Sequence, residues 1–85
     1  FMNVQVFDTH VKTTNGHYLH FDVLVTPEHA AKAKLYAQQF LQQQGYNSDD
    51  IQQQSCDFCH NEIATPAVIS AINAQGYYIL KLQGC

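Results

Sequence analysis

Hydrophobic and polar residues alternate in two runs near the start of the chain, at residues 3–12 and 17–25. Both runs are rich in Val, Phe, Tyr and Leu, which is the pattern of β-strands with one buried face. Between them, residues 13–16 read Thr-Thr-Asn-Gly and supply the residue types that favour a turn. The sequence therefore predicts a β-hairpin.

Two pairings of this hairpin are open. A two-residue turn at Asn15 and Gly16 pairs Val11 with His20, whereas a three-residue loop with a left-handed Gly16 pairs Val11 with Leu19. We favour the second, because the buried face determines the register and this pairing separates apolar from polar residues better. Its apolar face comprises Phe7, Thr9, Val11, Leu19, Phe21 and Val23.

Two helices are predicted by the same start signal, a Thr as N-cap followed by Pro at the first helical position. The first runs from Pro27 and the second from Pro66. Each has apolar residues at helical spacing and ends at a glycine that suits a left-handed cap, Gly45 and Gly76 respectively.

Residues 51–56 are predicted as a short polar strand and residues 77–82 as a final strand, so the order is ββαβαβ. This order predicts a single α+β domain over residues 1–85, a two-layer sandwich of a four-stranded mixed sheet with both helices packed on one face. Parallel crossovers would make strands two, three and four run the same way. Cys56 and Cys85 would then lie at one edge of the sheet.

Composition excludes several classes of function. Four lysines, no arginine and seven acids give a net charge of -3, which argues against a nucleic-acid surface. No run approaches the ~20 apolar residues of a membrane span. We expect Met2 to be the natural start, with Phe1 an added residue. Three cysteines without a signal peptide indicate reduced thiols or thiolate ligands, and hence a cytoplasmic protein.

The cysteines are the first candidate site. Cys56 and Cys59 form a C-x-x-C pair that is followed directly by His60, and Cys85 ends the sequence. Together they could supply the four nitrogen or sulfur ligands of a tetrahedral zinc site. Reduced cysteines packed as small apolar residues are the structural alternative. C-x-x-C-H is also the attachment pattern of c-type haem, but the exported, all-helical context of such proteins is missing, so we expect no haem.

A thiol-redox protein using Cys56 and Cys59 is the enzymatic alternative. Reactive C-x-x-C pairs usually sit at a helix N-terminus, which lowers the thiol pKa, whereas the predicted helix cap, Thr65, lies several residues beyond. No nucleophile can be placed beside an oriented base. We therefore favour a small binding or interaction protein over an enzyme.

A second polar cluster is predicted on the outer face of the hairpin, where His10 lies opposite His20 and Asp8 opposite Asp22. The preferred register also puts Lys12 and Tyr18 on this face. Such a group could hold a divalent metal ion or provide a base near neutrality. A solvated sheet face with ordinary His–Asp hydrogen bonds is the plainer interpretation.

The same face carries Val4, Val6 and Leu24. A sheet with helices on one side leaves its other face to water or to a partner. The apolar residues favour a homodimer through this uncovered face, and a dimeric accessory protein without site chemistry is a further alternative.

Several segments resemble a small bacterial family, domain of unknown function 2024. They are the Phe-Asp-Thr of residues 7–9, the His-Phe-Asp of residues 20–22, the Cys-x-Phe-Cys-His of residues 56–60, and the Gly-Tyr and Gly-Cys pairs of residues 76–77 and 84–85. The resemblance covers essentially the whole chain. It implies a small α+β sandwich and a cytoplasmic location, and it implies no particular activity.

Overall fold

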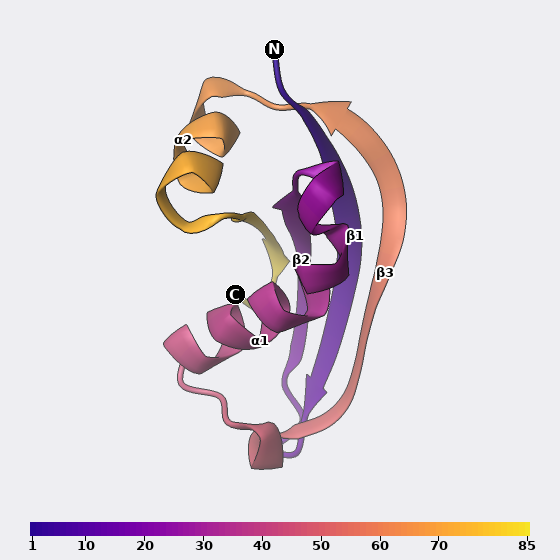
Figure 1. Ribbon diagram of the computed structural model, residues 1–85. Helices are drawn as coiled ribbons and strands as arrows, with labels where there is room; N and C mark the ends of the chain where they lie inside the picture. Colours follow the sequence, from indigo (N-terminus) through magenta and orange to yellow (C-terminus); the bar gives the residue numbers. More distant parts are fainter.

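The computed structural model describes residues 1–85 and shows an α+β fold with a four-stranded antiparallel sheet and two α-helices (Figure 1). The elements in order are β1 (Asn3–Thr13), β2 (Tyr18–Val25), the 3-10 helix η1 (Pro27–Lys32), α1 (Ala33–Gln43), the 3-10 helix η2 (Ser48–Asp50), β3 (Ile51–Ile63), α2 (Pro66–Gln75) and β4 (Tyr78–Gln83). No helix is long and apolar enough to span a bilayer.

The preferred hairpin register is confirmed. Val11 pairs with Leu19 and Thr9 with Phe21, and Gly16 has a φ of 88°, in the left-handed region that glycine adopts without strain. The apolar face of the hairpin packs against α1 in the larger core, where Phe21 meets Phe40 edge to face. We call this the helix face of the sheet, and the opposite side the open face.

The expected mixed sheet is wrong, because every neighbouring pair in the order β3-β1-β2-β4 is antiparallel. The segment from η1 to η2 returns the chain to the hairpin turn, where Thr14 N donates to the Asp50 carbonyl. β3 therefore starts beside the end of β1 and pairs with it, not with β2. β3 and β4 become opposite edges of the sheet, so Cys56 and Cys85 do not share an edge.

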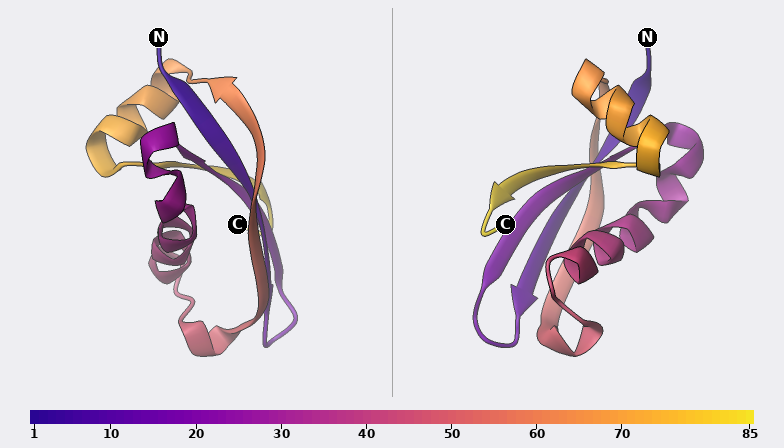
Figure 2. Two further views of the ribbon diagram at one scale, coloured as in Figure 1. Left: turned by 45° about the vertical axis from the view of Figure 1, so that its right-hand side comes forward. Right: turned by 90° about the vertical axis from the view of Figure 1, so that its left-hand side faces the viewer.

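The expectation that both helices pack on one face is also wrong. Alternate residues of a strand point to opposite faces, so Val4, Val6 and Leu24 point away from α1. They are buried together with Val68 of α2 in a second, smaller core. Because α2 joins two opposite edge strands, it crosses the end of the sheet where β1 begins (Figures 1 and 2). The apolar residues that suggested a dimer are thus covered within the chain.

β3 is longer than the sequence predicts and contains the whole C-x-x-C-H motif. It pairs along all of β1, and nearly all its side chains are exposed, which explains why its polar sequence resembles a loop. The pairing shifts between Phe58, which lies opposite Phe7, and His60, which lies opposite Val6. Cys59 is therefore the extra residue of a β-bulge.

The buried position of Val6 gives a testable prediction. Val6 is 2% exposed, so Val6→Asp would bury an unpaired carboxylate and should lower the free energy of unfolding by at least about 3 kcal/mol. Thermal or urea denaturation measures this. Ile63→Asp is the matched control, because Ile63 is 62% exposed at the end of β3. A stably folded Val6→Asp chain that only loses self-association would contradict the second core.

Candidate functional site

The structure does not bring the predicted cysteine ligands together. Cys56 faces α1, and its sulfur accepts a hydrogen bond from the Thr9 hydroxyl at 3.4 Å. Cys59 is exposed in the bulge. His60 lies on the open face, where it donates to Glu62 at 2.6 Å. Cys85 follows β4 at the other edge of the sheet.

The strand also separates the C-x-x-C pair. An extended chain rises by about 3.3 Å per residue, which places Cα atoms three residues apart at roughly 10 Å. A disulfide needs Cα atoms within about 7 Å, so Cys56 and Cys59 are too far apart even if the bulge shortens the segment somewhat. Burial raises the pKa of the Cys56 thiol, and burial also raises that of Cys85. Neither has the lowered pKa of a reactive thiol.

The residues that do come together belong to the second predicted cluster. His10 and His20 lie opposite each other across the hairpin, and their rings stack with centroids 4.2 Å apart. One carboxylate joins them: Nε2 of His10 donates to Oδ2 of Asp8 at 2.7 Å, and Nε2 of His20 donates to Oδ1 at 2.6 Å. We call Asp8, His10 and His20 the His–Asp cluster.

The ligand atoms of this cluster all lie within 4.8 Å of one another. The cluster is partly accessible, since the side chain of His20 is 26% exposed and that of Asp8 is 39% exposed. It is the one group of three or more His, Cys, Asp or Glu side chains in the chain that is close enough to share a metal ion. Two imidazole nitrogens and a carboxylate are a common ligand set for transition metals.

Charge is distributed unevenly between the two facing aspartates. The hydrogen bond from His20 lowers the pKa of Asp8, and the bond from His10 adds to this, although partial burial acts in the opposite direction. Burial raises the pKa of Asp22, and the charge of Asp8 raises it further. Asp8 is therefore the carboxylate that the fold keeps ionised.

Tyr18 is part of this site. The hairpin register predicts its place on this face, but nothing in the sequence indicates its bond to His10. Its hydroxyl hydrogen-bonds Nδ1 of His10, and its ring stacks on the same imidazole with centroids 5.8 Å apart. Tyr18 pairs with Lys12, so it is a diagonal neighbour of His10 in the correct register. Lys12 is exposed and makes no ion pair.

Comparisons with known proteins agree with this fold and give no activity. The family model described as a domain of unknown function (DUF2024) matches residues 2–82. The NMR structure of protein NE1680 from Nitrosomonas europaea is similar, with 39% sequence identity, 99% of each chain covered and a TM-score of 0.80. No curated protein matches the chain significantly.

The strand geometry predicts how the C-x-x-C pair responds to oxidation. Cys56 and Cys59 should form no disulfide with each other in the folded chain at a cytosolic poise of roughly −200 to −300 mV. A glutathione titration read by mass spectrometry measures this. In urea the constraint of the strand is lost, so the same titration should then produce the disulfide. A Cys56–Cys59 disulfide in fully folded protein would show that the motif is redox-active after all.

Proposed function

We propose that this chain, which belongs to the DUF2024 family, is a small binding protein that holds a divalent transition-metal ion with Asp8, His10 and His20. The observation that carries the proposal is the single Asp8 carboxylate between two stacked imidazoles. Zinc is the first candidate, because its open sites use three His or carboxylate ligands and leave a fourth position for water.

The hydrogen bonds of the cluster support a metal site of this kind. Both imidazoles direct Nε2 toward the same carboxylate. A metal ion would take the place of the two Nε2 protons between the rings and Asp8, without a change in the backbone. The ionised state of Asp8 favours this exchange, because a metal ligand must be deprotonated.

Tyr18 supports the site from outside the ligand set. With Nε2 of His10 on a metal, Nδ1 would carry the ring proton and donate it to the Tyr18 oxygen. Such outer hydrogen bonds fix the ring orientation and the tautomer of a ligating histidine. The antiparallel pairing of β1 with β2 holds all of these groups on a regular hairpin rather than on a loop.

We also propose a reducing, cytoplasmic setting for this protein. The three cysteines form no disulfide with one another, and such free thiols are typical of reducing compartments. A cysteine-based zinc site and a thiol-redox role gain no support from the positions of Cys56, Cys59 and Cys85. We therefore favour metal binding over an enzymatic thiol function.

A metal titration tests the proposal. We expect the folded chain to bind one Zn²⁺ or Co²⁺ per molecule in calorimetry and to melt at a higher temperature with metal present. His20→Gln removes a ligand and should weaken binding at least about tenfold, and Tyr18→Phe should weaken it less. His29→Gln is the matched control, because His29 lies in η1, outside the His–Asp cluster.

A second variant separates the two metal hypotheses. Replacing all three cysteines together, by Cys56→Ser, Cys59→Ser and Cys85→Ser, should leave metal affinity unchanged. If this variant loses the metal and His20→Gln keeps it, the ligands are the cysteines. If neither Zn²⁺ nor Co²⁺ binds the folded chain, the proposed function is wrong.

A further inference from the structure

A groove of about 300 Å³ lies on the helix face, between α1 and the edge strand β3. It is separate from the His–Asp cluster, which lies on the open face. Its walls are formed by Lys34, Ala37 and Gln38 of α1, by Thr9 of β1, and by Gln54, Ser55, Cys56 and Asp57 of β3. The volume is at the lower end of the range for ligand sites, which suits a small molecule.

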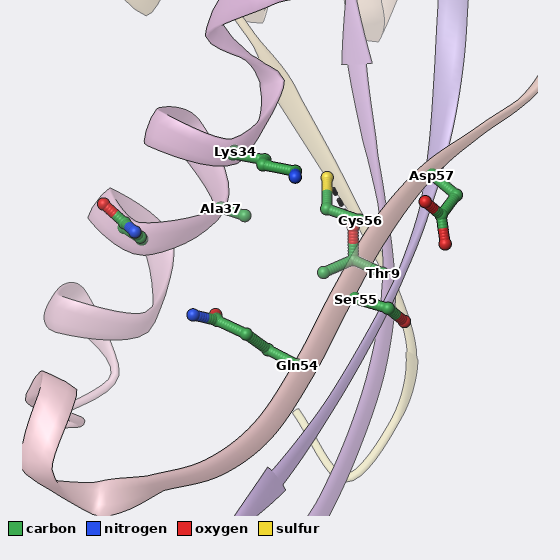
Figure 3. Close-up of a pocket in the computed structure, with 8 residues that line it drawn as sticks. Thr9, Lys34, Ala37, Gln54, Ser55, Cys56 and Asp57 are labelled. Carbon is green, nitrogen blue, oxygen red and sulfur yellow. Dashed lines mark hydrogen bonds between the residues drawn. The ribbon is translucent and has the colours of Figure 1, made fainter.

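Polar groups from both sides point into this groove. Figure 3 shows the Lys34 amine and the Gln54 amide directed into the space between α1 and β3, with the Cys56 thiol on the wall. Ser55 and Asp57 point to the other side of the strand (Figure 3). This agrees with the alternation of side chains and with the pairing of Asp57 opposite Asp8.

Lys34 is thus the charged group that enters the groove. The ion pairs of the structure all involve histidine, so Lys34 has no acidic partner within 4 Å. This is notable in a chain with seven acids and four lysines. Gln38 and Gln54 add amide groups that can donate hydrogen bonds. One unpaired cation with neighbouring neutral donors is an arrangement that favours a singly charged anion.

We propose that the α1–β3 groove binds a small organic carboxylate, with Lys34 as the charge partner and the amides of Gln38 and Gln54 as hydrogen-bond donors. A single lysine balances one carboxylate, whereas a doubly charged phosphate would call for further cations, and Lys34 is the only lysine or arginine among the lining residues. Ala37, the Thr9 methyl group and Cys56 offer contacts to a short apolar part of the ligand.

Butyrate and butyramide form a matched pair of probes, since they differ in charge and hardly in size. In a nuclear magnetic resonance titration of the isotopically labelled chain, butyrate should shift the amide signals of residues 34, 38, 54 and 56, with millimolar affinity. Butyramide should shift them at least about fivefold less. Equal shifts with both probes, or no shifts at these positions, would overturn the proposal.

Two lysine variants identify the charge partner. Lys34→Gln should reduce the butyrate shifts at least about fivefold, and Lys34→Arg should retain them. Lys32→Gln is the control, because Lys32 is exposed in η1 and does not line the groove. Lysine and glutamine have similar helix propensities, so Lys34→Gln should fold normally. If Lys34→Gln and Lys32→Gln have the same effect, Lys34 is not the partner and the proposal fails.

The cysteines give an independent readout on unlabelled protein. Butyrate should slow the alkylation of Cys56 by iodoacetamide at least about twofold and leave Cys59 unaffected, because Cys59 lies outside the groove on the same strand. Peptide mass spectrometry measures both rates in one sample. If butyrate slowed the alkylation of both cysteines equally, its effect would come from a general change in the solution. It would then not bind in the groove, and the proposal would fail.

Discussion

The rest of the structure depends on the register between β1 and β2. When Val11 lies opposite Leu19, the apolar residues of both strands share one face, and α1 covers them. The same pairing necessarily collects the intervening polar residues on the open face. His10 then lies opposite His20, close enough for both rings to reach one carboxylate. Core formation and the proposed metal site are therefore consequences of the same three-residue loop, which uses the left-handed Gly16.

This register also has an electrostatic cost, since it places Asp8 directly opposite Asp22. Like charges at facing positions of a sheet destabilise it. Two imidazoles that donate to Asp8 offset part of this repulsion. Burial is the main reason that the pKa of Asp22 is raised, and the charge of Asp8 raises it further. Asp57 of β3 lies opposite Asp8 on its other side, so a cation bound at this face would reduce the repulsion among three carboxylates.

Much of the fold could be predicted from residue patterns, and the failures have a physical cause. The hairpin, its register and the second helix, with Thr65 as a cap and Gly76 left-handed, follow from local rules that the structure obeys. Strand order does not follow from local rules, because it depends on where the segment from η1 to η2 returns the chain. The length of β3 could not be predicted either. Its polar residues form a strand because β1 offers a free edge along its whole length, and the strand's own propensity is weak.

The candidate site, like the fold, could be predicted only where local rules decide the structure. Asp8, His10 and His20 could be grouped from the hairpin register alone, because cross-strand neighbours follow from the turn. The proximity of Cys56 to Lys34 could not be predicted, since it needs the packing of α1 against an edge strand. The backbone conformation of the C-x-x-C-H motif could not be predicted for a related reason. A spacing indicates a metal site only if the segment forms a loop, and here it forms an extended strand.

The bulge at Cys59 decides which face the end of β3 presents. In a regular strand, His60 would point to the same side as Phe58, toward the helix face. The extra residue reverses this, so Phe58 packs edge to face on Phe7 while His60 lies opposite Val6 on the open face. Burial raises the pKa of Asp22, and the nearby His60 acts in the opposite direction. A single inserted residue thus keeps the aromatic contact with β1 and brings a third histidine to the face of the His–Asp cluster, which is how bulges commonly redirect side chains beside functional sites.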